Sequence, residues 1–246
     1  MGANAALFLD LDGTLFDFAL RPGDVVVAPG LRQSLARLSS RLHGALALVS
    51  GRPLTEIDAL IGSGHAAAGV HGAQLRHADG SIECAAITPS DLDSVRALTA
   101  TIAARTPGVI IEDKSDAIAL HYRGAPHAQD ALERSALALL AVAGSGFALQ
   151  HGNHVIEIKP ADCDKGIAVG QLMQRVPFAG RTPWMIGDDL TDEHAFERVN
   201  VLGGISVIVG SRRPTAAQYA FRAPDSARRW LEREAAIDDS NREDHA

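Results

Sequence analysis

The chain is poor in cysteine and in clustered positive charge, and each shortage excludes a class of protein. Its two cysteines, Cys84 and Cys163, lie far apart and form neither a zinc pattern nor a Cys-x-x-Cys motif, which excludes a disulfide framework. We expect both to be reduced thiols in the core. A formal charge of −7 and the absence of Lys/Arg runs argue against partners such as nucleic acid or an anionic membrane.

Long apolar stretches and targeting signals are also missing. Charged residues interrupt the apolar stretches well short of the roughly 18 residues that a membrane span needs. There is no Asn-x-Ser/Thr sequon, and the first basic residue is Arg21, so the charged start of a signal peptide is absent. These features predict a soluble, cytoplasmic protein. Because no long amphipathic seam is left over, we expect a monomer.

Lysine is rare in this chain. The 23 basic residues include only Lys114, Lys159 and Lys165, and arginine stands nearly everywhere that a generic surface charge would suffice. An ammonium group has chemistry that a guanidinium cannot supply. We therefore predict a specific role for each lysine, the alternative being three leftover surface residues.

The remaining sequence is rich enough in apolar residues, 46% of 246, to fold as one large domain or two modest ones. Apolar strands alternate with helical periodicity in both the first and the last third, which predicts an α/β fold with a Rossmann-like parallel sheet flanked by helices. The middle third contains a hairpin around Asp79-Gly80, two helices and antiparallel strands, which predict a smaller α+β unit. The expected organisation is a core domain at 1–74 and 161–237, an inserted α+β domain at 75–160, and a flexible tail at 238–246.

Two acidic clusters follow predicted strands. Asp10 and Asp12 come directly after the apolar run at 5–9, and residues two apart in an extended chain point to the same side. Gly13 allows a sharp bend after them. Far downstream, a strand at 183–186 is followed by Asp188, Asp189 and Asp192. Carboxylates at the ends of two strands suit a shared hard cation such as Mg²⁺.

Simpler interpretations explain less. A solvated turn rich in Asp and Gly is common, and either cluster alone fits it. A calcium loop needs a bidentate Glu at its twelfth position, where Arg21 or Val199 stands when counting from each cluster. His151 and His154 lack further ligands for zinc. Because a cluster of aspartates follows an apolar strand at two places in the chain, we favour a metal site shared by the two clusters.

Ligands of open parallel sheets bind beyond the carboxyl ends of the strands. Four polar motifs fall there or at the start of the following helix: Asp10/Asp12, Ser50-Gly51-Arg52, Lys165-Gly166 and Asp188/Asp189/Asp192. This set resembles the haloacid dehalogenase superfamily of phosphohydrolases, whose four signature motifs occur in this order across the core.

The resemblance implies catalytic roles for individual residues. Asp10 would attack phosphorus and form an aspartyl-phosphate intermediate. Asp12 would protonate the leaving sugar oxygen and then activate water. Ser50 would hold phosphoryl oxygens, and Lys165 would bridge Asp10 and the phosphoryl group. Thr14 would contact the leaving group or the phosphoryl group, or serve only the turn.

The resemblance also implies a metal site for Mg²⁺. Its ligands would be Asp10, Asp188 and the backbone carbonyl of Asp12. Asp189 and Asp192 would support the water shell of the metal or orient the nearby lysine.

The position of the inserted unit matches the C2 caps of this superfamily, which close over sugar phosphates. Within it, three segments resemble trehalose-6-phosphate phosphatases: Glu112-Asp113-Lys114, His121-Tyr122-Arg123 and Glu157-Ile158-Lys159-Pro160. One departure from that family is Leu190, where a charged or polar residue is common, although its neighbours match.

By this resemblance, Glu112, Lys114 and Glu157 would hydrogen-bond the hydroxyls of the disaccharide, because charged hydrogen bonds discriminate between sugars. The alternative is a set of cross-strand salt bridges on a solvated sheet face. Arg52 and His71 would border the phosphate or the sugar, and Arg123 would position the cap over the substrate. The alternative for each of the three is a purely structural role.

The expected function is therefore that of a Mg²⁺-dependent phosphatase whose small-molecule partner is a phosphosugar, trehalose 6-phosphate. A sister enzyme acting on sucrose phosphate or a phosphoglycerate-linked mannose is the first alternative. A phosphomutase on a similar scaffold is another. A catalytically idle phosphosugar-binding module is expected to lose Asp10 or Asp12, and both are present.

Overall fold

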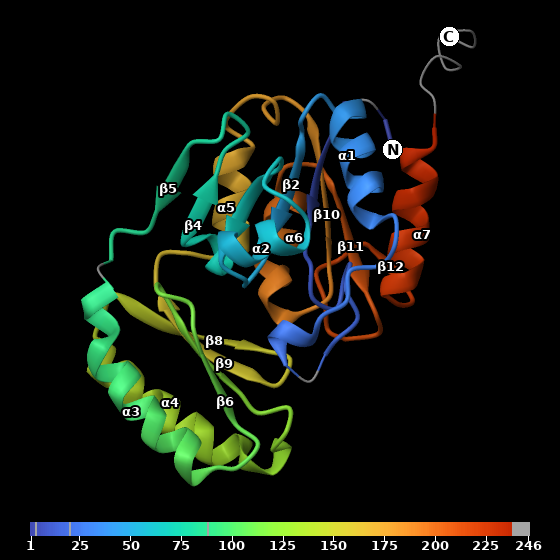
Figure 1. Ribbon diagram of the computed structural model, residues 1–246. Coiled ribbons are helices and arrows are strands. Elements are labelled where there is room, and N and C mark those ends of the chain that lie inside the picture. The colour runs from blue at the N-terminus through green and yellow to red at the C-terminus, as the bar shows by residue number, and fades with distance from the viewer. Residues whose placement is uncertain (3, 20, 88, 238–246) are drawn as a thin grey trace, which may run out of the picture.

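The computed structural model describes residues 1–2, 4–19, 21–87 and 89–237, so the tail predicted at 238–246 lies outside the described residues. Two sheets organise the chain (Figure 1). The larger has eight strands in the order β12-β11-β10-β1-β2-β3-β4-β5, and the smaller has four in the order β6-β7-β9-β8.

The larger sheet comprises β1 (Ala5–Leu9), β2 (Leu46–Val49), β3 (Ala66–Gly69), β4 (Gln74–Arg76), β5 (Ile82–Cys84), β10 (Thr182–Gly187), β11 (Ile205–Val209) and β12 (Tyr219–Phe221). Its helices are α1 (Leu31–Arg41), α2 (Leu54–Leu60), α5 (Lys165–Leu172), α6 (Glu193–Val201) and α7 (Pro224–Ala235). The smaller unit comprises α3 (Asp93–Arg105), β6 (Ile110–Asp113), β7 (Ile118–His121), α4 (Gln129–Ala143), β8 (Phe147–Gly152) and β9 (Val155–Pro160).

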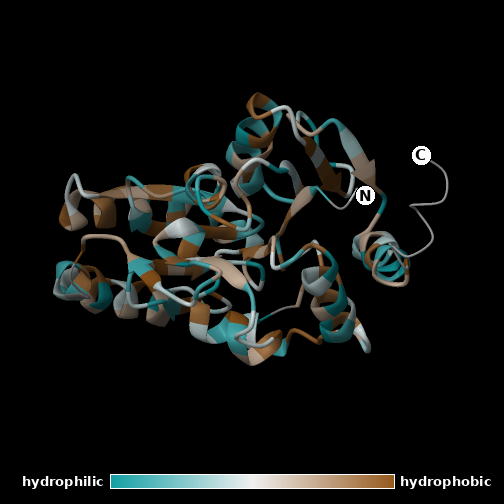
Figure 2. Cartoon of the chain, turned by 90° about the horizontal axis from the view of Figure 1, so that it is seen from above, coloured by the Kyte–Doolittle hydropathy of each residue, from teal (hydrophilic) through white to brown (hydrophobic). Residues whose placement is uncertain are grey.

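Strand β1 lies at the centre of the larger sheet, between β10 and β2, and pairs in parallel with both. Its five side chains are at most 2% exposed, which explains the unbroken apolar run. In Figure 1, α1 and α7 lie on one side of the strands, and α5 and α6 on the other. Figure 2 shows hydrophilic and hydrophobic residues together on the helices, as expected for helices that pack on one face. This confirms the predicted α/β fold.

The hairpin of β4 and β5 belongs to the larger sheet and not to the inserted unit in which we expected it. β4 pairs antiparallel with both β3 and β5. Leu75 is buried in the main core, and Arg76 donates two hydrogen bonds to Asp58 of α2, of 2.7 and 2.8 Å. These contacts hold the hairpin to the larger sheet. Because β5 is an edge strand, Cys84 is exposed and its predicted place in the core was wrong, while Cys163 is partly buried.

The smaller unit has its own hydrophobic core. Helices α3 and α4 pack on one face of its sheet, around buried side chains such as Leu120 and Ile156. The other face of that sheet is turned toward the larger sheet (Figure 1). Within the described part of the chain, every helix falls short of the length and apolar character needed to cross a membrane.

All three lysines are buried, which excludes the surface alternative. Lys114, Lys159 and Lys165 are 7%, 4% and 2% exposed. The ammonium group of Lys159 donates to the backbone carbonyls of Pro160 and Cys163. It therefore ties together the segment that leads from β9 to α5.

Candidate active site

The carboxyl ends of three adjacent strands form the floor of the site. Asp10 directly follows β1, Ser50 follows β2, and Asp188 follows β10. Because the sheet places β1 between β10 and β2, the two acidic clusters meet although more than 170 residues separate them. Lys165, the first residue of α5, reaches the same point.

Lys165 is the central cation of this floor. Its Nζ lies 2.7 Å from Asp10 Oδ1 and 2.7 Å from Asp192 Oδ1. Burial alone would lower the pKa of Lys165, but the charges of the two carboxylates raise it above the ordinary lysine value. The lysine therefore remains positively charged inside the fold.

Asp10 and Asp188 face each other across Thr14. The Thr14 hydroxyl lies 3.1 Å from Asp10 Oδ2 and 3.1 Å from Asp188 Oδ1, and its single proton can serve only one of them. Burial raises the pKa of Asp10 to about 7 despite Lys165, and burial also raises the pKa of Asp188 well above its ordinary value. Gly13, at φ 83°, makes this approach possible, because a side chain there would collide with Asp188.

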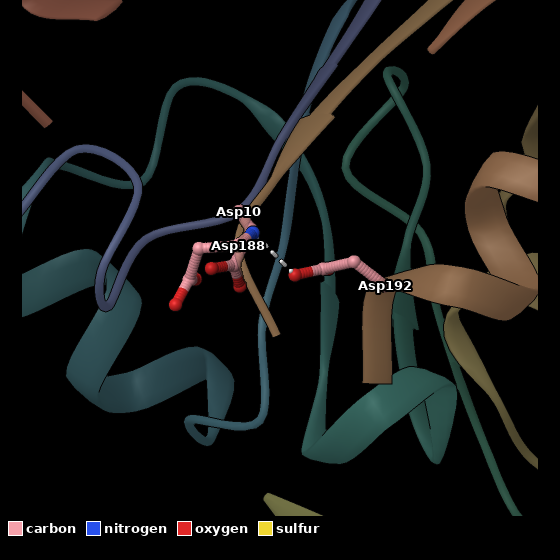
Figure 3. A group of neighbouring side chains, drawn as sticks. All are labelled: Asp10, Asp188 and Asp192. Atoms are coloured by element: carbon pink, nitrogen blue, oxygen red, sulfur yellow. Dashed lines mark hydrogen bonds between the residues drawn. The ribbon is translucent and has the colours of Figure 1, made fainter. Parts of the chain in front are cut away.

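Asp192 shapes the bend that carries Asp188. Its Oδ2 accepts a hydrogen bond from the backbone N–H of Asp188 at 2.9 Å (Figure 3). The same oxygen accepts one from the backbone N–H of Asp189 at 3.0 Å, and Oδ1 accepts one from Lys165. The guanidinium group of Arg212 also donates hydrogen bonds to the backbone carbonyls of Asp188 and Asp189. No sequence motif pointed to Arg212, because its role depends on a loop folding back over the bend.

The acidic cluster has the donors of a divalent cation site. One carboxylate oxygen from each of Asp10, Asp188 and Asp192 lies within 4.8 Å of the others. Asp192 is already engaged by Lys165 and two backbone N–H groups, so Asp10 and Asp188 are the carboxylates available to a cation. The buried Asp10 and Asp192 and the half-buried Asp188 carry three carboxylates near one ammonium group, which leaves an excess of negative charge. A hard cation such as Mg²⁺ fits this donor set.

Asp12 is turned away from the acidic cluster and toward Arg52. Arg52 Nε and Nη2 each lie 2.7 Å from a different oxygen of Asp12, the fork-like geometry that favours Arg–carboxylate pairs. Arg52 also donates to Glu56 Oε2 at 2.8 Å and to the Pro22 carbonyl at 2.9 Å. We predicted Arg52 as a substrate contact. In this structure its donors instead form hydrogen bonds with Asp12, Glu56 and the Pro22 carbonyl.

The smaller sheet closes the site from the opposite side. Lys114 Nζ donates to Glu157 Oε2 and to the Gly51 carbonyl, both at 2.8 Å, so it bridges the two units. His71 Nε2 lies 3.2 Å from the same oxygen of Glu157. Burial would raise the pKa of Glu157, but the charge of Lys114 lowers it below the ordinary value. Burial lowers the pKa of His71, so Lys114 is the cation that balances this carboxylate.

His71 has an uncommon backbone conformation for a residue with a side chain, at φ 55° and ψ 27°. Its ring packs against Gly51, where a Cβ atom would come within 2.7 Å of the imidazole. Two buried atoms, His71 Nδ1 and Glu157 Oε1, have no hydrogen-bond partner among the described residues. Unsatisfied buried polar atoms are costly, so a ligand that supplies their partners would be favoured.

A second bridge joins the units at the rim. The Arg123 guanidinium lies 4.7 Å from the ring centroid of Phe18 in the loop after β1, and Arg123 also donates to the Asn153 carbonyl at 3.2 Å. The backbone N–H of Asn153 donates to Asp189 Oδ2 at 3.0 Å. Asp189 therefore contacts the smaller unit and does not enter the acidic cluster.

One pocket gathers most of the residues predicted from the sequence: Asp10, Asp12, Ser50, Arg52, His71, Glu112, Lys114, Arg123, Glu157, Lys165 and Asp189. Asp188 lines an adjacent depression, and Asp192 is fully buried. The pocket is also lined by His121, Gln150 and Asn153, which we did not predict. His121 stands in a segment that the resemblance had singled out, so the signal for it was present.

The chain is similar to known proteins along most of its length. The model of a family described as trehalose-phosphatase matches residues 8–225. A probable trehalose-phosphate phosphatase of Sinorhizobium fredii is 47% identical over 225 residues, which cover 91% of this chain and 84% of that protein. The trehalose-6-phosphate phosphatase of Escherichia coli is 41% identical over 233 residues, which cover 94% and 87%.

A solved structure shows the same fold. The C-terminal domain of the C. albicans trehalose-6-phosphate phosphatase matches with a TM-score of 0.84 at 22% identity, covering 95% of this chain and 92% of that one. Since the family model spans most of the chain and both sequence relatives align over nearly its whole length, the chain belongs to the trehalose-phosphatase family.

Proposed function

We propose that this chain hydrolyses trehalose 6-phosphate to trehalose and inorganic phosphate. The observation that carries the proposal is that Asp10 and Lys165 face Glu112, Lys114 and Glu157 across one pocket. The first pair can attack and neutralise a phosphoryl group, whereas the other three offer charged hydrogen-bond partners for sugar hydroxyls. The sugar itself is suggested by the names of the two sequence relatives.

We propose Mg²⁺ as the cofactor, with Asp10, Asp188 and the backbone carbonyl of Asp12 as its protein ligands. When bound, the ion supplies positive charge to the phosphoryl oxygens and keeps Asp10 ionised. The support is the pair formed by the buried Asp10 and the half-buried Asp188, because the loss of solvent raises the pKa of both carboxyl groups. Asp189 and Asp192 hold the loop that presents Asp188.

The proposed reaction has two steps on the same aspartate. A carboxylate oxygen of Asp10 forms a bond to phosphorus while the bond from phosphorus to the sugar oxygen breaks, and Asp12 gives its proton to the departing oxygen. Water then attacks the aspartyl phosphate, Asp12 takes up a proton from it, and the Asp10 carboxylate is restored. Throughout, Ser50 and Lys165 hold the phosphoryl oxygens.

Asp12 must leave Arg52 before it can act as an acid. Both of its carboxylate oxygens accept hydrogen bonds from Arg52, so it cannot donate a proton in the arrangement seen here. We propose that the substrate phosphate, an anion that competes for the same guanidinium, releases Asp12. The position of Arg52 in the lining of the pocket supports this proposal.

We also propose that the smaller unit acts as a cap. Lys114 contacts the Gly51 carbonyl and Asn153 contacts Asp189, so the structure corresponds to a closed arrangement. In this proposal, a disaccharide phosphate enters when these contacts open, and re-closing excludes water from the reaction. The chain crosses between the units after Cys84 and again before α5.

A cytoplasmic location and a monomeric state complete the proposal. Both cysteines are free thiols, as a reducing compartment maintains them. Each unit encloses its own hydrophobic core. Size-exclusion chromatography with light scattering checks the second point, and a mass near twice 25.9 kDa would contradict it.

The substrate assignment is tested by a panel of sugar phosphates in the presence of Mg²⁺. We expect kcat/KM for trehalose 6-phosphate to exceed that for glucose 6-phosphate by about 10²-fold or more, because the second sugar ring satisfies otherwise unpaired polar groups of the cap. Release of inorganic phosphate is the measurement. Equal kcat/KM values for the two compounds would contradict specificity for a disaccharide phosphate. A higher value for sucrose phosphate or mannosyl phosphoglycerate would identify that compound as the substrate instead.

The cap assignment is tested by Glu112→Ala. We expect kcat/KM for trehalose 6-phosphate to fall by about 10²-fold, because a charged hydrogen bond to the sugar is lost, while p-nitrophenyl phosphate is hydrolysed within about twofold of the original rate. Glu133→Ala is a matched control, since Glu133 also pairs with a histidine of the cap, His151, but outside the pocket. An equal fall in kcat/KM with both substrates would show that Glu112 does not contribute to recognition of the sugar.

A further inference from the structure

Glu112 is held by a histidine from the neighbouring strand. Glu112 lies opposite Ala119 in the β6–β7 pair, and Ile110 lies opposite His121, so Glu112 and His121 are diagonal neighbours on one sheet face. His121 Nε2 is 2.6 Å from Glu112 Oε2. Both side chains line the pocket.

The contact engages one oxygen of the carboxylate only. Oε1 of Glu112 has no hydrogen-bond partner among the described residues, whereas Oε2 is tied to the imidazole. Burial would raise the pKa of Glu112, but the hydrogen bond to His121 and the charge of Lys114 hold it below its ordinary value. Glu112 is thus a carboxylate whose orientation is fixed and whose second oxygen remains an acceptor.

The second glutamate of the cap, Glu157, is arranged in the same way: one carboxylate oxygen is engaged and the other is not. Glu157 Oε2 is engaged by Lys114 and by an imidazole, that of His71, while Oε1 is buried without a partner in the described part of the chain. Two glutamates on different strands therefore each present one free oxygen after a histidine has engaged the other. This repetition argues against an incidental contact between Glu112 and His121.

We propose that His121 is a positioning residue for substrate specificity, which orients Glu112 so that Oε1 accepts a hydrogen bond from a sugar hydroxyl. The inference rests on the proposed function, because it concerns the sugar half of the same pocket. Its physical basis is preorganisation: a carboxylate that is already aligned loses less side-chain freedom when the sugar binds. Without His121, Glu112 would have to be ordered by the substrate itself.

The test compares two amides at position 121. In His121→Gln the side-chain nitrogen lies about as far from the backbone as Nε2, so the donor to Glu112 is retained. In His121→Asn the nitrogen reaches only as far as Nδ1, and the donor is lost. We expect His121→Asn to raise KM for trehalose 6-phosphate roughly tenfold, with kcat changed much less, and His121→Gln to restore most of the affinity.

Three comparisons separate positioning from a structural role. Hydrolysis of p-nitrophenyl phosphate is expected to stay within about twofold in both variants, since that compound has no sugar hydroxyl to read. His151→Asn is the matched control, because His151 pairs with Glu133 at 2.9 Å away from the pocket. In the Glu112→Ala background, His121→Asn is expected to cause no further loss, as required if His121 acts through Glu112.

Several outcomes would overturn the inference. These are an unchanged KM for trehalose 6-phosphate in His121→Asn, an equal loss with both substrates, or full additivity with Glu112→Ala. Failure of the unmodified chain on trehalose 6-phosphate is a different result, because it contradicts the proposed function. The same variants are then measured with the sugar phosphate of the panel that is turned over best, and the same criteria apply.

Discussion

Replacing Asp10 by Asn is expected to reduce the release of inorganic phosphate from trehalose 6-phosphate by about 10⁴-fold or more, because an amide oxygen cannot serve as the nucleophile. The substitution keeps the shape of the side chain and its place beside Lys165 and Thr14. It also removes one of the two carboxylates proposed to hold Mg²⁺. We therefore expect weaker Mg²⁺ binding by isothermal titration calorimetry, which is a readout independent of turnover.

Asp58→Asn provides the control for this experiment. Asp58 is also an aspartate in a close ion pair, with Arg76, but it lies on α2 and outside the pocket. We expect its replacement to leave both turnover and Mg²⁺ binding nearly unchanged. Retention of a tenth or more of the activity in Asp10→Asn would refute the assignment of Asp10 as nucleophile.

Replacing Lys165 by Met is expected to lower both the stability and the activity of the chain. Two buried carboxylates would lose their shared ammonium partner, and breaking a buried ion pair in this way costs about 3–5 kcal/mol. The substitution also removes a cation from the proposed phosphoryl site. Loss of a single electrostatic contact at such a site lowers kcat by about 10²–10³-fold. Thermal unfolding and steady-state kinetics measure the two effects.

Lys159→Met separates the catalytic effect of Lys165 from the general effect of removing a buried lysine. Lys159 is buried to a similar degree, but its ammonium group binds backbone carbonyls between β9 and α5. We expect this control to lower the melting temperature without a comparable loss of kcat. If Lys165→Met folded as stably as the unmodified chain and kept its kcat, the central place of Lys165 in the site would be wrong.

The sequence predicted the floor of the site because local rules determine it. Asp10 and Asp188 each follow a short apolar run, and parallel strands end at a common edge of the sheet, so their convergence could be anticipated. The resemblance to a family then assigned roles to Ser50 and Lys165. Those roles remain proposals, although the structure brings the residues together.

Contacts between side chains that come from different segments of the chain were not predicted. The pairing of Arg52 with Asp12 arises because two different loops approach each other, and spacing along the chain does not encode the direction of a guanidinium. His121 meets Glu112 only through the diagonal register of two strands. The hairpin of β4 and β5 was assigned to the wrong unit because its alternation fits either sheet.

Weak local signals account for the other differences. Strand β12, Tyr219–Phe221, was not predicted, since three residues are too short for periodicity to identify. Cys84 was expected in the core because free cysteine is usually buried, but an edge strand exposes it. In both cases, the position of a strand within the sheet decided the outcome.

The burial of every lysine has a practical consequence for solution studies. Reagents that acylate primary amines react with these buried side chains only when the structure around them opens. The extent of modification therefore measures how often each region opens. Lys114 belongs to the smaller unit and donates to the Gly51 carbonyl of the larger one, whereas the ammonium group of Lys165 lies between the carboxylates of Asp10 and Asp192. Acylation at Lys114 alone would therefore register separation of the two units, and acylation at Lys165 would register loss of the inner fold.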